Sequence, residues 1–223
     1  MIDPAMLLHI QMTITNPDGS RTEIKKPIAP INGALNALFK SCEVTFGATA
    51  LPTSPGAMPY VQYLYSLLSY NPTAQNSVLR KSLWYRDGPG SFNYIGNDMI
   101  NPGFDSRSSW VMNRSCDMLG PLLIDICKTS RLLLNRMNIN IKLYRSSPQF
   151  YIMTEDTDDK NYRVSIDVAE LLVRRVRPRP IDVSRLEAEL SRHHARYPYV
   201  QNTLFPITMP ANTKNIGKTL LQL

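Results

Sequence analysis

The 223-residue sequence predicts an all-β fold, an antiparallel sandwich or jelly roll with short inserted helices. Short apolar runs alternate with polar residues at a period of two, which is typical of half-buried strands. Seventeen prolines and ten glycines lie between these runs, as expected of turns and long loops. With 43% hydrophobic residues, the chain has enough apolar side chains to bury a core.

The first half predicts two strands. In LLHIQMTITN every second residue from Leu8 to Ile14 is apolar, and the polar residues between them form the opposite face. The sequence NPDGS follows directly and predicts a turn. CEVTFG predicts a second, shorter strand with Val44 and Phe46 on one face.

Three segments have helical spacing instead. INGALNALFK and PYVQYLYSLLSY repeat their apolar residues at helical intervals, and Pro59 stands at the start of the second segment. SRLEAELSRHHA begins with Ser184 and has Glu187 three residues on, the pattern of a capping box. We expect these short helices to lie over a sheet or to fill long connections.

The second half returns to strand patterns, in GPLLIDI, LLLNRMNINIKLYRS, QFYIM and YRVSIDVAELLVRRV. In the last of these the alternation slips at Ala169, which predicts a β-bulge. TEDTDDKN, between the last two, predicts an acidic hairpin tip, and YPYVQNTLFPITMPANT resumes strand character after the last helix.

The residue types that carry chemistry are sparse. Three cysteines without CxxC spacing predict neither a zinc site nor a disulfide framework. Neither His9 nor the adjacent His193 and His194 stands in a nucleophile or metal motif. The sequence therefore predicts no catalytic, metal or cofactor site. Trp84 beside Tyr85 is consistent with base stacking, but an anchor in the core is the favoured interpretation.

The candidate contact site is LLVRRVRPRP, which places Arg174, Arg175, Arg177 and Arg179 within six residues. Alternation predicts that they lie mostly on the outer face of a long strand, which RPRP ends because proline donates no ladder hydrogen bond. Eight arginines between positions 163 and 196 face five acidic residues, so the local excess of charge is small. An interface between subunits and a nucleic-acid-binding arm both remain open.

Five pieces of the sequence occur in an order that resembles a known family: FKSCEVTFG, YVQYLYSLLSYNPTAQNSVLRKSLWYRD, DMLGPLLIDICKTSRLLLNRMNINIKLYRS, VAELLVRRVRP and ARYPY. The chain resembles the double jelly-roll major capsid protein of Polinton/Maverick elements and adintoviruses over nearly its whole length. The resemblance implies a viral jelly-roll fold and a structural, hexon-like building block of trimeric capsomers, with no catalysis.

The resemblance also implies an organisation. Residues 1–197 would be the first jelly roll without its first strand, and residues 198–223 the crossing to a second one, with GKTLLQL as a strand cut short. The implied partners are further copies in a homotrimer, neighbouring capsomers and a penton-type minor capsid protein, and contact with packaged DNA stays open.

The expected location is a virion capsid, or the host nucleus or cytoplasm if a genomic copy is expressed. No signal-peptide pattern and no 18-residue apolar stretch occurs, so neither secretion nor a membrane span is expected. Two alternatives to a capsid role are a domesticated host β-sandwich binding module and a nucleic-acid-binding protein that uses the stretch from Arg174 to Arg179.

Overall fold

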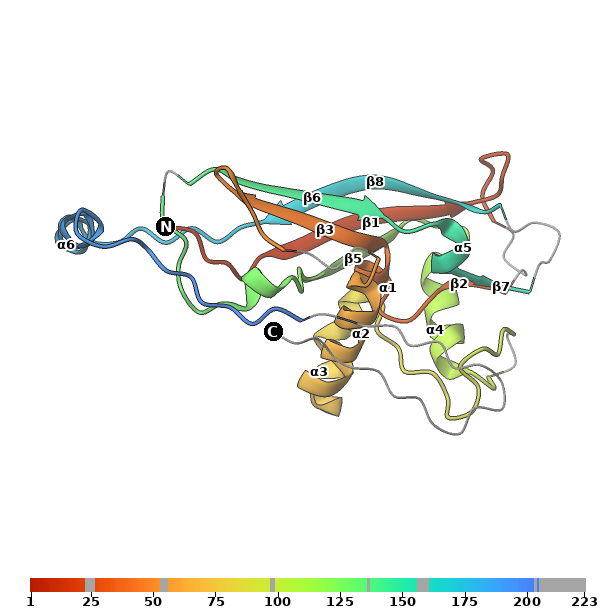
Figure 1. Cartoon of the computed structure of the whole chain (residues 1–223). Helices are drawn as coiled ribbons and strands as arrows, with labels where there is room; N and C mark the ends of the chain where they lie inside the picture. The colour runs from red at the N-terminus through yellow and green to blue at the C-terminus, as the bar shows by residue number, and fades with distance from the viewer. Residues whose placement is uncertain are drawn as a thin grey trace, which may run out of the picture.

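Three antiparallel β-sheets form the frame of the computed structural model, which describes residues 1–22, 27–52, 56–96, 99–135, 137–155, 161–202 and 204 (Figure 1). The strand orders are β5-β1-β8, β4-β3-β6 and β2-β7. The strands are β1 (Leu7–Thr15), β2 (Ile28–Pro30), β3 (Phe39–Phe46), β4 (Thr49–Ala50), β5 (Cys116–Pro121), β6 (Ile139–Arg145), β7 (Ile152–Thr154) and β8 (Arg163–Leu172). The helices are α1 (Ala34–Ala37), α2 (Met58–Ser69), α3 (Pro72–Gln75), α4 (Pro102–Val111), α5 (Pro148–Tyr151) and α6 (Pro180–Leu190), with 3₁₀ turns at η1 (Leu79–Ser82) and η2 (Asp125–Lys128).

The two larger sheets share one hydrophobic core, to which Ile10 of β1, Val44 of β3 and Met118 of β5 contribute. The helices α1 to α4 lie on one side of these sheets, and α6 stands apart at one end of the molecule (Figure 1). The antiparallel β structure that the sequence predicts is confirmed and is compatible with a sandwich. Helix and strand each account for 28% of the described residues, so the helices are more extensive than predicted.

Strand β1 is the centre of its sheet, where it pairs antiparallel with both β5 and β8. Its burial alternates as predicted, and the side chains from Leu8 to Ile14 that face the core are at most 4% exposed. The predicted bulge in β8 is also present. Gln11 pairs with Val168 and Met12 with Ile166, so the extra residue is Asp167, two positions before the predicted slip.

Two strand predictions in the second half are wrong in part. GPLLIDI lies mostly outside β5, which ends at Pro121, and Asp125–Lys128 form the 3₁₀ turn η2. In QFYIM only the last two residues belong to β7, because Pro148 opens the helical turn α5. Proline is favoured in the first turn of a helix, where its missing N–H leaves no hydrogen bond unmade.

The first and the last of the three predicted helices also differ from the prediction. INGALNALFK contains only the four-residue α1, because the chain enters β3 at Phe39. The capping box at Ser184 is wrong: α6 begins at Pro180, and Ser184 lies inside it, where its hydroxyl donates to the Pro180 carbonyl. Pro180 and Asp182, which lies in the first turn of α6, provide the start signal instead.

Helix α2 is present as predicted, but the wrong face is buried. The helix buries Gln62 and Ser66, whereas Tyr60, Leu64 and Leu68 are 51%, 43% and 81% exposed. These three residues follow one another at intervals of four and form a single line on the helix surface. We call them the α2 stripe. The buried face is therefore apolar at Met58 and Pro59 and polar at Gln62 and Ser66, and the α2 stripe faces outward.

Several predictions fall outside the described residues, namely most of the acidic hairpin tip and the C-terminal strands with GKTLLQL. Within residues 197–202, which are described, the chain forms no strand. None of the helices in the described ranges is long and apolar enough to cross a membrane.

Candidate interaction surface

The prediction that the four contact arginines lie mostly on the outer face of a long strand is wrong. Strand β8 ends at Leu172, and the arginines lie beyond it on the segment that leads to α6, where all four are exposed. The backbone there pairs with the first residues of the chain. The Asp3 amide donates to the Arg174 carbonyl and the Val176 amide to the Met1 carbonyl, both at 2.9 Å. Residues 1–3 therefore fix the backbone of this segment, and the arginine side chains project from a backbone that is held in place.

Two of the four arginines have acidic partners within the chain. Arg174 is 2.6 Å from Asp3, and Arg179 is 2.9 Å from Asp182 at the start of α6. Arg175 and Arg177 form no ion pair with any residue that the structure describes. The charge that this segment offers to a partner is therefore smaller than its arginine count indicates.

Helix α6 carries an apolar ridge that its own chain covers only in part. Val183, Leu186 and Leu190 recur at the spacing that places them on one helix face. No residue of α6 is buried, and Figure 1 shows the helix away from both sheets. Most of the stability of a helix this short comes from packing of its apolar face. Val183, Leu186 and Leu190 are each partly exposed, so the ridge offers apolar surface to a partner.

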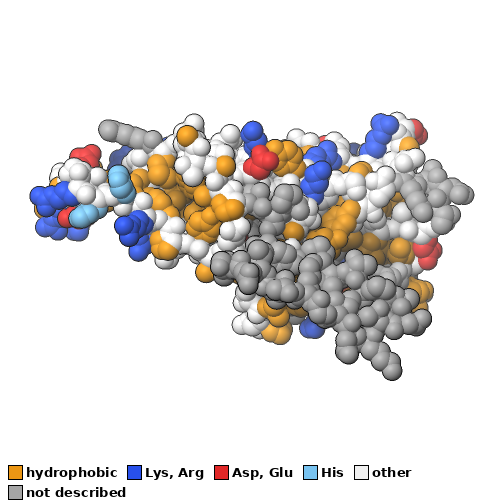
Figure 2. All heavy atoms as spheres, in the orientation of Figure 1, with side chains coloured by type: hydrophobic (Ala, Val, Ile, Leu, Met, Phe, Trp, Pro, Cys, Tyr) orange, Lys and Arg blue, Asp and Glu red, His pale blue; other side chains and the backbone are white. Residues whose placement is uncertain are grey.

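The exposed apolar surface continues from α6 back along the chain. Leu171, Leu172, Val173 and Val176 are between 36% and 46% exposed, next to the four arginines. We call residues 171–190 the α6 surface. Basic side chains and histidines gather at this end of the molecule, with a few acidic ones among them (Figure 2). Apolar side chains beside charged ones are typical of protein interfaces.

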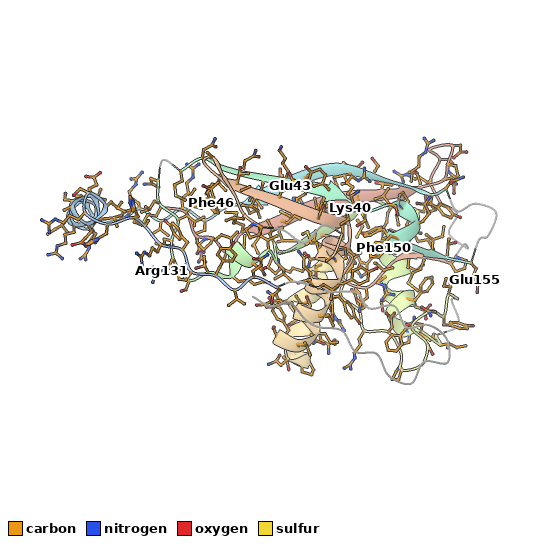
Figure 3. All side chains as sticks on the ribbon, viewed as in Figure 1. Lys40, Glu43, Phe46, Arg131, Phe150 and Glu155 are labelled. Carbon is orange, nitrogen blue, oxygen red and sulfur yellow. The ribbon has the colours of Figure 1, made fainter. Side chains whose placement is uncertain are left out.

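A basic groove that sequence reasoning missed lies beside the α6 surface. The Arg131 guanidinium donates to the Arg196 carbonyl at 2.8 Å and joins two segments that are distant in the sequence (Figure 3). His193 and His194 line the groove past the end of α6, and Glu189 is its one acidic lining residue in the described part of the chain. The arginines that flank the two histidines were the only signal in the sequence.

His9 has acidic partners on the two neighbouring strands, which the strand alternation in the sequence did not reveal. It lies on the outer face of β1, with Nδ1 3.2 Å from Glu170 of β8 and Nε2 3.2 Å from Asp117 of β5. The hydrogen bond to Glu170, followed by that to Asp117, raises the pKa of His9 above its usual 6.5. The protonated imidazole thus links all three strands of this sheet.

We expect the stability of the protein to depend on pH through His9. A pKa that folding raises stabilises the folded state fully below the unfolded pKa of about 6.5, and this contribution is lost as pH rises through the folded value. The free energy of unfolding should fall from pH 6 to pH 9 more steeply in the native chain than in His9→Gln. Urea unfolding followed by circular dichroism measures both slopes, and equal slopes would contradict this role.

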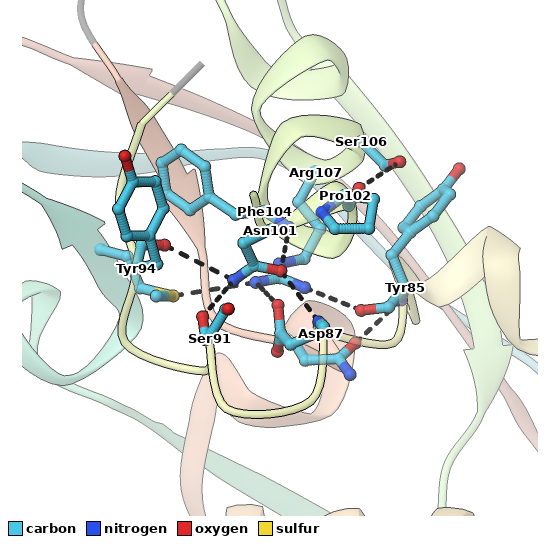
Figure 4. Close-up of polar contacts among 12 residues, drawn as sticks. Tyr85, Asp87, Ser91, Tyr94, Asn101, Pro102, Phe104, Ser106 and Arg107 are labelled. Atoms are coloured by element: carbon cyan, nitrogen blue, oxygen red, sulfur yellow. Dashed lines mark hydrogen bonds and ion pairs between the residues drawn. The ribbon is translucent and has the colours of Figure 1, made fainter. Parts of the chain in front are cut away.

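A buried ion pair fixes the loop that precedes α4 (Figure 4). Arg107 is fully buried, and its Nη2 lies 2.8 Å from the Asp87 carboxylate. Its Nε donates to the Pro30 carbonyl and its Nη1 to the Tyr85 carbonyl. Burial lowers the pKa of Arg107, and the Asp87 charge acts against this change. Every one of these contacts is internal, so the cluster is structural.

Asn101 completes the same cluster (Figure 4). Its side-chain oxygen accepts from the amides of Gly88 and Phe104, and its amide nitrogen donates to the Ser91 carbonyl at 3.0 Å. The glycine-rich GPGSFNYIG segment is therefore a loop held against the start of α4. Trp84 is 4% exposed, which agrees with a core anchor.

No group of three or more histidine, cysteine or acidic side chains in the described ranges is arranged to hold a metal ion. A scan against protein-family models and a search of curated proteins find no match to the chain.

Proposed function

We propose that the chain is a capsid-like structural subunit, built on a jelly-roll framework, that self-associates into trimers through the α6 surface. The observation that carries the proposal is the apolar ridge of α6, whose three residues are all left partly exposed by their own chain. The frame of antiparallel sheets is compatible with this role, and the collinear sequence resemblance supports the jelly roll and the capsid origin.

The structure offers a second surface that suits the ridge. The α2 stripe is also apolar, exposed and helical, and it spans about 12 Å against about 10 Å for the ridge, at 1.5 Å per residue. Figure 1 shows α2 and α6 far apart in one chain, so the two surfaces meet only between copies. A contact between two different surfaces repeats from copy to copy, and a trimer closes such a ring.

We expect Leu186→Glu combined with Leu190→Glu to convert the trimer into a monomer, because two charges would enter an apolar contact. Leu68→Glu on the α2 stripe should have the same effect from the other side. Ala188→Glu is the matched control, since position 188 lies on the opposite face of α6. Sedimentation velocity of each purified full chain measures the mass.

Mixing the two disrupted variants distinguishes the proposed contact from an α6-to-α6 contact. The intact ridge of Leu68→Glu should dock on the intact stripe of the double variant, so an equimolar mixture should form heterodimers but no closed ring. A native chain that stays monomeric at its highest soluble concentration would overturn the proposal. Disruption by the control at position 188 would remove the assigned role of the ridge.

A further inference from the structure

A pocket of about 520 Å³ lies between α2, α1 and the segments that follow η1 and α5. Aromatic rings form much of its wall. Tyr63 lies against Trp84 with ring centroids 5.0 Å apart, and Tyr60 meets Phe150 edge to face at 5.7 Å. Phe150 (Figure 3) comes from α5, so the wall joins elements that are distant in the sequence. The volume is that of sites for small organic molecules.

Three buried polar side chains that line this pocket lack hydrogen-bond partners. Gln62 is 2% exposed, and neither its amide nitrogen nor its amide oxygen has a partner in the described part of the chain. The same is true of the Asn36 oxygen and the Trp84 indole nitrogen. Buried polar groups are nearly always paired, because an unpaired one loses its bonds to water without replacement. Unpaired groups that gather at one pocket therefore indicate a ligand.

The lining of the pocket also fixes the charge of that ligand. Asp87 is the one charged residue among its described lining residues, and Arg107 already neutralises it at 2.8 Å. A charged ligand would lose its hydration without gaining a counter-ion. The unpaired atoms comprise donors at Gln62 and Trp84 and acceptors at Gln62 and Asn36. A ligand group that has both a hydrogen-bond donor and an acceptor can pair with these atoms.

We propose that this pocket binds a small uncharged aromatic molecule that carries a carboxamide. The ring packs among the tyrosine, phenylalanine and tryptophan side chains, and the amide pairs with the Gln62 side chain. The pocket borders the α2 stripe, because Tyr60 and Leu64 line both. The two roles are still tested by different residues, since Gln62 lies on the buried face of α2 and Leu68, the stripe residue replaced above, is not part of the pocket lining.

Three probe molecules of similar size test the chemistry on the full native chain. Benzamide has the ring and the amide, toluene has the ring alone, and benzoate replaces the amide by a charge. We expect benzamide to bind about tenfold more tightly than either of the others, the effect of about one net hydrogen bond. Titration followed by protein NMR measures the three affinities. Equal affinities for benzamide and toluene would overturn the proposal.

Gln62→Leu tests the residue. Removal of an unpaired buried amide should raise the melting temperature of the unliganded protein by about 2–4 °C and weaken benzamide binding about tenfold. The matched control is Gln75→Leu, a buried glutamine whose amide donates to the Tyr70 carbonyl at 2.8 Å and which lies outside the pocket lining.

The control should lower the melting temperature and leave the benzamide affinity unchanged. The two variants should therefore shift the melting temperature in opposite directions, and only Gln62→Leu should weaken benzamide binding. Unchanged benzamide binding by Gln62→Leu would overturn the assignment. Loss of binding in both variants would also overturn it, because the effect would then not be specific to the pocket.

Discussion

Replacing Arg107 by leucine is expected to lower the free energy of unfolding by about 3–5 kcal/mol. The substitution leaves the Asp87 carboxylate, whose side chain is 10% exposed, without the cation that it faces at 2.8 Å. It also removes the donors to the carbonyls of Pro30 and Tyr85. A buried charge or carbonyl that has lost its partner costs more than the pair contributed. Urea unfolding followed by tryptophan fluorescence measures the loss.

Two further variants separate the buried charge from the other contacts. Arg174→Leu breaks an ion pair in which the arginine side chain is 72% exposed, so its effect should stay within about 1 kcal/mol. Adding Asp87→Asn to Arg107→Leu should recover part of the loss, because no unpaired charge then remains buried. A loss below about 1 kcal/mol for Arg107→Leu would contradict a structural role for this arginine.

The same arginine shows where sequence reasoning reaches its limit. Within α4, the sequence PGFDSRSSWV has no apolar repeat, and nothing in it predicted a helix. The helix depends on Asn101, whose side chain accepts from the Phe104 amide, and on Arg107, whose partners lie 20 to 77 residues away. Contacts of that range leave no periodic signal, although Asn101 followed by Pro102 is a local signal for a helix start.

Strands whose two faces differ in exposure were predictable. In β1 each buried residue alternates with a more exposed one, and the pattern in the sequence records that difference directly. The bulge in β8 was predictable for the same reason. Its position differed by two residues, because the pairing with Gln11 and Met12 places the extra residue and the alternation alone does not.

Helix α2 shows a different limit. Its periodicity predicted the helix correctly, but periodicity identifies a face without saying what covers it. The buried face holds Gln62 and Ser66 beside the proposed ligand pocket, and the exposed face holds the α2 stripe, the proposed docking surface. Both departures from the simple rule coincide with the two proposed sites, as expected where a surface serves binding as well as stability.

The exposure of the predicted contact site could be read from the sequence, but its place beyond the end of β8 and the partners of its arginines could not. All four arginines are exposed, yet Asp3 and Asp182 pair with two of them. The partner of Arg174 lies 171 positions earlier in the sequence, so only the pairing of residues 1–3 with the end of β8 brings the two together. The groove at Arg131 escaped prediction for the same reason.

The second large effect concerns the two faces of β1. Replacing Ile10 by alanine should lower the free energy of unfolding by about 2–5 kcal/mol, because the side chain is fully buried and its loss leaves a cavity. Ile10 is opposite Met118 on one side and Ala169 on the other, at the centre of the β5-β1-β8 sheet. The residues around this cavity are densely packed, so they can move only partly into the space that Ile10 leaves.

Gln11→Ala is the matched control, since Gln11 is the next residue of the same strand and faces the other way. Its effect should stay within about 0.5 kcal/mol, as for surface positions without special contacts. Urea unfolding of both variants compares the faces directly. A sandwich needs the face of β1 that carries Ile10 to be the inner one, so a large difference between the variants supports two sheets around one core. Equal losses would mean that both faces of β1 are covered, and a two-layer arrangement would then be wrong.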